Sequence, residues 1–93
     1  MIKSDLTQLL YEELDHRVSR PTCTDLVNAV FFEMKAQLIA GHDIKLSGFG
    51  KFVVKDKAKR IGRNPQTGEP IEIAARRIVT FKASERLKNT MNE

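Results

Sequence analysis

The chain has 93 residues, of which 41% are hydrophobic and 30% are charged, and its formal net charge is +4. This is the composition of an ordinary globular protein, and no apolar run approaches the roughly 18 residues of a transmembrane helix, so we expect no membrane partner. A single domain of this size buries only about 60% of its unfolded surface, and we therefore expect a partner chain to complete its core.

An amphipathic helix is predicted from Ser4 to about Asp15. Ser4 suits the N-cap position, and Asp5 falls in the first turn, where a negative charge favours a helix. The N-terminus turns polar and acidic almost at once, unlike a secretory signal peptide, so we expect a cytoplasmic protein. The helix prediction rests on leucines that recur at the spacing of one helix face: Leu6, Leu9, Leu10 and Leu14.

A second and longer helix is predicted after a short link at residues 16–18. Pro21 is tolerated only in a first helical turn and marks the start. Gly41 suits the position just after the end, so the helix should reach Ala40. Its apolar stripe is wider than one short helix can cover: Leu26, Val27, Val30, Phe31, Met34 and Leu38, with Phe32 and Ile39 beside them.

Three strands and a short helix are predicted in the remainder. A short strand contains Ile44 and Leu46, Ser47-Gly48 makes a tight turn, and a second strand begins at Phe49. A return strand with period-two apolar residues spans 71–81 and is interrupted by Arg77. A polar helix spans 84–92 with Ser84 as its N-cap. Because this order contains no βαβ unit, it predicts an α+β fold with a three-stranded antiparallel sheet.

The positive charge is concentrated in one segment. Residues 51–82 contain nine lysines and arginines against three acidic residues, whereas the other residues contain seven basic against nine acidic ones. A surface that binds a polyanion requires this kind of segregation.

The middle of this basic segment is predicted to project as an arm. In an extended strand, Lys55, Lys57 and Lys59 share one face, and the other face carries Asp56, Ala58 and Arg60. Neither face of this outgoing strand has core-forming side chains beyond Val54. A two-stranded ribbon of this kind does not pack stably in water by itself, so we expect a mobile arm that becomes ordered on binding.

The tip of the arm, GRNPQTG, suggests a wedge for DNA. Lysines and arginines along a ribbon can follow a phosphate backbone, and a ribbon is thin enough to enter a groove. Pro65 is rigid, apolar and without an N–H group, and it is flanked by Arg63 and Asn64, which can hold groove edges. Apolar wedges inserted between base steps unstack and kink a duplex.

Three segments carry a family resemblance: KLSGFGKF, RIGRNPQTGEPI and ARRIVTFKAS. Together they closely resemble the bacterial HU and integration host factor family of DNA-bending proteins, and the likeness covers essentially the whole chain. The ARRIVTF strand and the KLSGFG turn look more like the alpha subunit of integration host factor, whereas MIKSDL looks like its beta subunit or HU. Two assemblies therefore stay open, a non-specific homodimer and one half of a sequence-preferring heterodimer.

The resemblance implies an intertwined dimer that bends double-stranded DNA in the bacterial nucleoid. Residues 1–40 would form the helical dimerisation part, 41–54 and 75–82 the sheet body, 55–74 the DNA-binding arm and 84–92 the C-terminal helix. Pro65 matches the intercalating proline of the family. Its DNA contacts map onto Arg60, Arg63 and Asn64 in the arm, onto Lys55, Lys57, Lys59, Arg76 and Arg77 along the backbone, and onto Lys3, Ser47, Gly48, Lys82 and Lys88 near the flanking phosphates.

Functions other than DNA bending have less support in the sequence. The five phenylalanines lie at core-facing spacings and predict a buried cluster rather than a stacking platform for single strands. His16, His42 and Cys23 lack the companions of a metal site, and no nucleophile or paired carboxylates suggest catalysis, so we expect no cofactor, no metal, no small-molecule substrate and no enzyme activity. A protein-interaction module with incidental DNA affinity and an RNA-binding protein remain as alternatives.

Overall fold

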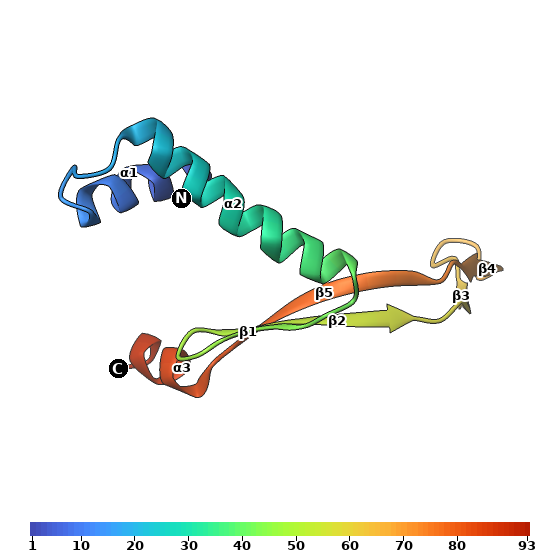
Figure 1. The fold of residues 1–93 in the computed structure, drawn as a ribbon. Coiled ribbons are helices and arrows are strands. Elements are labelled where there is room, and N and C mark those ends of the chain that lie inside the picture. Colours follow the sequence, from blue (N-terminus) through green and yellow to red (C-terminus); the bar gives the residue numbers. More distant parts are fainter. The chain divides into compact units, whose positions relative to one another are not determined.

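The computed structural model describes all 93 residues, which form two compact units, Met1–Ala36 and Gln37–Glu93. No helix combines the length and apolar character needed to span a bilayer. Three helices and five strands follow one another along the chain (Figure 1): α1 Lys3–Glu13, α2 Arg20–Ile39, β1 Ile44–Leu46, β2 Gly50–Lys57, β3 Arg60–Arg63, β4 Pro70–Ile73, β5 Arg76–Ala83 and α3 Glu85–Met91.

Helix α1 begins earlier than the sequence predicts. Its N-cap is Ile2 rather than Ser4, which lies inside the first turn. The carboxylate of Asp5 accepts a hydrogen bond from the backbone N–H of Ile2 at 2.7 Å. Asp5 thus reaches back to the chain before the helix, as an acidic residue at the third helical position can, and no side-chain oxygen is needed at the N-cap.

The link between α1 and α2 is held by local contacts. Asp15 and His16 both adopt left-handed backbone conformations, with φ of 51° and 60°. The imidazole of His16 stacks on the ring of Tyr11 with the centroids 4.3 Å apart. Helix α2 then starts where Pro21 predicts, with the hydroxyl of Ser19 accepting a hydrogen bond from the N–H of Thr22 at 3.3 Å.

The end of α2 confirms the predicted stop at Gly41. This glycine has a φ of 87°, and its N–H donates to the carbonyl of Leu38. The N–H of His42 donates to the carbonyl of Gln37 at 3.0 Å. These two bonds form a Schellman motif, which satisfies carbonyls that the helix end would otherwise leave without donors.

The sheet of the second unit has the order β1-β2-β5 and is antiparallel. Phe49 does not begin the second strand as predicted, because its N–H donates to the carbonyl of Leu46 and closes the turn, and β2 starts at Gly50. A Cβ at Gly50 would lie 2.5 Å from the backbone oxygen of Lys82 and 2.6 Å from the Phe81 ring. Only glycine therefore allows β5 to approach this closely.

The return strand predicted over 71–81 divides into β4 and β5, and the interruption does not lie at the predicted Arg77, which is part of β5. The ladder between β2 and β5 ends at the pair Lys57–Arg76, and a separate ribbon of β3 and β4 begins at the pair Arg60–Ile73. Ala74 and Ala75 lie at the break, where small side chains with low strand propensity offer nothing for the opposite strand to pack on. Strand β2 runs through Lys57, so the first residues of the predicted arm belong to the sheet.

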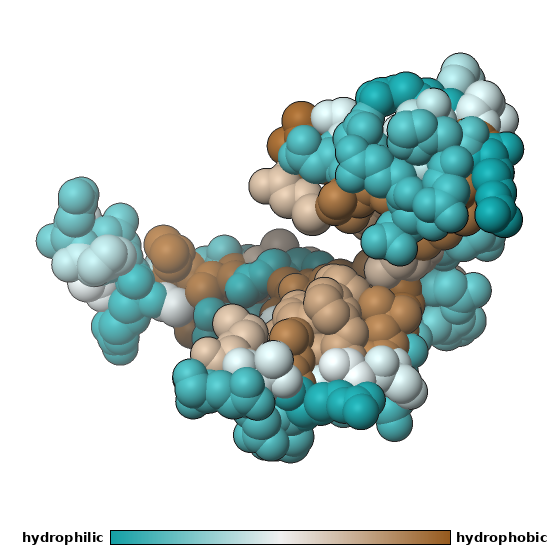
Figure 2. Space-filling model, turned by 90° about the vertical axis from the view of Figure 1, so that its left-hand side faces the viewer, coloured by the Kyte–Doolittle hydropathy of each residue, from teal (hydrophilic) through white to brown (hydrophobic).

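Most apolar side chains stay exposed in the single chain. Only the side chains of Cys23, Val27 and Thr7 are buried. Phe81 packs against Phe49 and Phe52, with ring centroids 5.3 and 5.0 Å away, yet Phe49 remains 49% exposed. The prediction of a buried phenylalanine cluster is thus wrong for the isolated chain, and Figure 2 shows hydrophobic residues gathered at its surface. Contiguous exposed apolar surface of this kind marks an interaction face.

Candidate nucleic-acid interface

One face of the sheet carries a row of lysines. Lys45 in β1 is the register partner of Lys51 in β2, and Lys51 is the register partner of Lys82 in β5. Residues directly opposite one another project on the same side of a sheet, so three ammonium groups lie in line across three strands. Like charges placed opposite each other destabilise a free sheet, whereas an anion laid across them turns the same row into a binding surface.

The same face stays basic along the sheet toward the ribbon. Lys55 and Lys57 follow Lys51 at even intervals in β2, and Arg76 is the register partner of Lys57. No acidic residue of these strands lies on this face, because Asp56 alternates with Lys55 and Lys57 and therefore points to the opposite side of the sheet. We call this surface the basic face: Lys45, Lys51, Lys55, Lys57, Arg76 and Lys82.

Four of the residues that the sequence predicts as DNA contacts lie on the basic face, and two of its members were missed. Lys55, Lys57, Arg76 and Lys82 were predicted. Lys45 and Lys51 were not, although both alternate with apolar residues in their strands. That alternation is the only signal in the sequence, and it becomes informative only when the register aligns the two lysines with Lys82.

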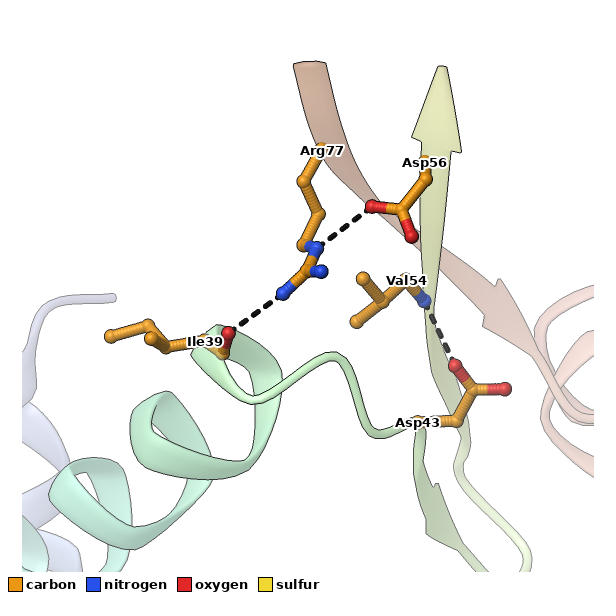
Figure 3. A network of polar contacts seen from close by, with 5 residues as sticks. All are labelled: Ile39, Asp43, Val54, Asp56 and Arg77. Carbon is orange, nitrogen blue, oxygen red and sulfur yellow. Dashed lines mark hydrogen bonds and ion pairs between the residues drawn. The ribbon is translucent and has the colours of Figure 1, made fainter. Parts of the chain in front are cut away.

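Arg77 lies on the other face of the sheet and is occupied by intramolecular partners (Figure 3). Its Nε donates to Oδ1 of Asp56 at 2.8 Å, and its Nη1 donates to the carbonyl of Ile39 at 2.8 Å. Nearby, Oδ1 of Asp43 accepts from the N–H of Val54 at 2.9 Å. The guanidinium thus connects β5, β2 and the end of α2, which separates Arg77 from the other predicted cations.

A pocket of about 210 Å³ lies at the end of the basic face, beside the turn between β1 and β2. The N–H of Ser84 donates to the carbonyl of Phe49 at 3.0 Å, which holds the start of α3 against this turn. The Ser84 hydroxyl accepts from the N–H of Leu87 and caps α3 as predicted. The pocket brings together three predicted residues, Ser47, Gly48 and Lys82, and it is also lined by Lys45, Leu46, Gly50, Lys51, Ala83 and Ser84.

Arg86 is a further cation at this end that the sequence reasoning missed. A Cβ built on Gly48 would lie 3.5 Å from Nη1 of Arg86, so the guanidinium rests over the turn. Lys88, which the sequence predicts as a contact, lies one residue beyond Leu87 and pairs with Glu85 at 3.6 Å. An arginine over a glycine turn can offer several parallel N–H donors to a phosphate, which a lysine cannot.

The ribbon of β3 and β4 presents its two predicted arginines on opposite faces. Arg60 pairs with Ile73, and Arg63 pairs with Pro70. Because side chains alternate along a strand, residues three apart point to opposite sides. Lys59, just before β3, forms an ion pair with Glu72 at 2.5 Å, with both side chains well exposed.

The tip of the ribbon is a hydrogen-bonded loop in which Pro65 is exposed. The N–H of Asn64 donates to the carbonyl of Glu69 at 2.8 Å, and the N–H of Gly68 donates to the carbonyl of Asn64 at 2.7 Å. The Asn64 side chain accepts from the N–H of Gln66, and Nη1 of Arg63 donates to the carbonyl of Gly68 at 3.1 Å. Asn64 and Arg63 therefore shape the loop that presents Pro65.

Lys3 lies in the other unit, at the start of α1. It lines a pocket of about 350 Å³ together with residues of both helices. One of these is Arg20, whose guanidinium lies 5.8 Å from the ring centroid of Tyr11 and hydrogen-bonds to the side chain of Gln8. This pocket is lined by Lys3, Ser4, Thr7, Arg20, Thr24 and Asn28.

The two histidines have partners other than a metal ion. His42 Nδ1 lies 3.1 Å from Oε1 of Gln37, and His16 stacks on Tyr11. No group of three or more His, Cys, Asp and Glu side chains could hold a metal ion.

Comparison with known proteins identifies the family. Residues 1–92 match the family model described as "Bacterial DNA-binding protein". The chain belongs to this family. Members with the name integration host factor subunit alpha are similar over the whole chain: the protein of Anaeromyxobacter sp. (strain K) is 48% identical over 92 residues, covering 99% of this chain and 80% of that protein. The protein of Bordetella avium (strain 197N) is 46% identical, covering 100% of this chain and 78% of that one.

Solved structures agree with this bacterial DNA-binding family. The chain aligns with an Anabaena HU–DNA cocrystal structure at a TM-score of 0.78 and 27% identity, covering 98% of this chain and 97% of that chain. A solution structure of a mutant of transcription factor 1 aligns at a TM-score of 0.66 and 24% identity, covering 99% and 91%, and this likeness supports the fold alone. The predicted α+β fold and the predicted relationship to HU and integration host factor are confirmed, and the chain is a DNA-binding protein.

Proposed function

We propose that this protein is an architectural factor that dimerises and bends double-stranded DNA by inserting its ribbons into the minor groove. The observation that carries the proposal is the exposed Pro65 in a hydrogen-bonded loop, at the tip of the ribbon that follows the basic face along the chain. A rigid apolar wedge is effective only if its support does not yield, and the hydrogen bonds across the tip supply that support.

The basic face would follow the phosphate backbone. Six cations without an acidic neighbour on the same face neutralise phosphates and release counterions, which makes binding steeply salt-dependent. The pocket lined by Ser47, Gly48 and Lys82 would hold a flanking phosphate, with the guanidinium of Arg86 close to Gly48. Lys3 and Lys88 are proposed as outer phosphate contacts, as the family resemblance implies.

The ribbon would read DNA mainly through its shape. The minor groove presents a pattern that separates A·T from G·C pairs but little more, so preference would come from groove width and from steps that kink easily. Arg60 and Arg63, on opposite faces of the ribbon, would contact the two walls of the groove. Asn64 would act through the loop that it shapes, as well as at the groove edge.

Dimerisation would cover the apolar surface that the single chain leaves exposed. Phe32, Val30 and Ile39 of α2 and Phe49 of the sheet unit are all about half exposed or more. We propose an HU-like homodimer as the main assembly. The alternative is one subunit of an integration host factor heterodimer, and the relatives that carry the name subunit alpha favour this alternative.

In the cell, this activity would place the protein in the bacterial nucleoid, within the cytoplasm. Bent DNA is compacted, and bending also brings distant sites together for recombination and for the regulation of transcription. These roles need DNA geometry rather than bond-making chemistry, so we propose a function without enzymatic catalysis.

Energy transfer between the two ends of a labelled duplex of about 35 base pairs tests the proposal. The purified chain alone should bring the ends together, and its Pro65→Ala variant should do so much less, because alanine cannot act as a rigid wedge. Gln66→Ala, one residue further along the exposed tip, is the matched control and should bend DNA like the unchanged chain. Equal bending by the chain and by Pro65→Ala would refute the wedge.

Further outcomes separate the alternatives. Ends that stay apart with the chain alone, but approach once a related subunit is added, would establish the heterodimer. Weak binding without any bend in both cases would favour a protein-interaction module. In competition at equal length, preference for single-stranded or duplex RNA over duplex DNA would favour an RNA-binding protein.

A further inference from the structure

Ile61 is the most exposed large hydrophobic side chain of the ribbon. It lies in β3, is 77% exposed and has Glu72 as its register partner in β4. The position of Ile73, on the other face, is different: it is half-buried, and a Cβ built on Gly62 would lie 2.8 Å from its Cδ1. Ile73 thus covers the ribbon's own backbone at Gly62, whereas Ile61 is left in water.

The free ribbon gives Ile61 no packing role. The partner across the ladder is a carboxylate, and that carboxylate is already engaged with Lys59 at 2.5 Å. Aromatic or β-branched partners across a ladder stabilise a ribbon, and a Glu opposite an Ile does not. The side chain therefore contributes little to holding β3 and β4 together.

The surroundings of Ile61 indicate what covers it. Arg63 lies two residues away on the same face of β3, and Lys59 reaches this side through its ion pair with Glu72, the register partner of Ile61. Arg60 is the immediate neighbour of Ile61 in the chain. An apolar side chain framed by cations complements a surface that is apolar between two rows of negative charge. The walls of a DNA minor groove have this character, because deoxyribose C–H groups line them and phosphates border them.

We infer that Ile61 packs against the deoxyribose wall of the minor groove and supplies an uncharged part of the ribbon's affinity for DNA. This inference rests on the proposed function and deepens it. The cations bring the ribbon to the groove, and Ile61 adds a contact that displaces water from sugar without neutralising a phosphate. Ile61 is a binding residue in this scheme, with no part in the wedge at Pro65.

The signature of such a contact is a loss of affinity at unchanged salt dependence. Ile61→Thr keeps the branch at Cβ but replaces the ethyl group of the side chain by a hydroxyl. It should weaken DNA binding about tenfold, because apolar surface is lost on both ribbons of the dimer. The slope of log affinity against log salt should stay the same, because every phosphate is still neutralised as before. Ile61→Val should retain most of the affinity, whereas Arg60→Ala should reduce the slope.

The experiment measures the dissociation constant of the whole protein for one duplex at several salt concentrations. The unchanged chain is compared with Ile61→Thr, Ile61→Val, Arg60→Ala and Met91→Gln, the last being a control at an exposed apolar residue outside the ribbon. The unfolding temperature without DNA is measured for each variant, and it should be the same for the unchanged chain and for Ile61→Thr.

Each outcome has one meaning. If the unchanged chain neither binds nor bends DNA, alone or together with a related subunit, the proposed function falls and the inference with it. If it binds and Ile61→Thr binds equally well, only the inference is overturned. The inference is also overturned if Ile61→Thr changes the salt slope or lowers the unfolding temperature, or if Ile61→Val loses as much DNA affinity as Ile61→Thr. Each of these results would contradict an uncharged contact between Ile61 and DNA.

Discussion

Arg76 and Arg77 show how neighbouring residues of the same type acquire different roles. Arg76 belongs to the basic face, opposite Lys57, whereas Arg77 bonds to Asp56 and to the carbonyl of Ile39. The family resemblance implies both as DNA contacts, because both match positions that meet the DNA backbone. Alternation along β5 gives them opposite orientations, and the partners on each side decide what each does.

This difference predicts opposite effects of the two alanine substitutions. Arg77→Ala should lower the free energy of unfolding by about 1–2 kcal/mol, because it removes two hydrogen bonds at a half-exposed site and leaves the Ile39 carbonyl without this donor. Arg76→Ala should leave stability almost unchanged and weaken DNA binding. Denaturant unfolding and binding at several salt concentrations check both.

The outcome for DNA also tests the predicted contact at Arg77. A lower salt slope for Arg77→Ala at full stability would show that Arg77 contacts phosphate directly. A loss of stability with an unchanged slope would show that it acts only inside the protein.

At the scale of the element, the row of three lysines across β1, β2 and β5 is the least expected feature of the sheet. Each lysine is unremarkable in its own strand, and the row exists only because the register pairs Lys45 with Lys51 and Lys51 with Lys82. Lys51, in the middle, faces a like charge on both sides. Repulsion in the free protein and attraction to an anion then act on the same residue.

Lys51→Ala should therefore separate stability from binding. Removing the central charge should leave the free energy of unfolding unchanged or slightly higher, because two repulsive pairs disappear. DNA binding should weaken, and the salt slope should fall by about one unit for each phosphate that the variant no longer neutralises. Lys35→Ala, at an exposed lysine of α2, is the control for the loss of a charge alone. A marked loss of stability in Lys51→Ala would contradict this account.

At the scale of the whole molecule, the small core decides how the chain must exist. Only two apolar residues are buried, whereas fifteen large hydrophobic ones are exposed. A chain of this length with so little buried apolar surface is marginal alone. The partner chain expected from length thus has a physical basis in the surface left uncovered.

The thermal stability of the protein should therefore depend on its concentration. If dimerisation supplies the missing core, the unfolding temperature should rise over about a hundredfold increase in concentration, because association favours the folded state by mass action. Circular dichroism at several concentrations, with sedimentation to give the mass, checks this. A constant unfolding temperature and a monomeric mass would contradict it. If a related subunit is the true partner, the rise should be steeper in the mixture than in either chain alone.

Much of the fold could be predicted from local patterns, and the errors lie where packing overrides them. Periodicity identified three helices and the three-stranded sheet, and Gly41 and Ser84 marked helix boundaries correctly. The start of α1 was missed because Asp5 caps from within the helix. Period-two spacing carried the return strand across Ala74 and Ala75, because spacing alone does not show where a strand loses its hydrogen-bonded partner. The boundary between arm and sheet body that the family resemblance implies, at 74 and 75, coincides with this break.

By itself, the sequence determined the family, the α+β class, the basic segment and the wedge motif, because these depend on composition, spacing and short motifs along one chain. Only the tertiary structure decided which cations share a surface. Lys45, Lys51 and Lys82 come together, and Arg77 is turned away, through cross-strand register. Register arises from contacts between distant residues, such as the close approach of β5 at Gly50, and a one-residue shift would reverse every face.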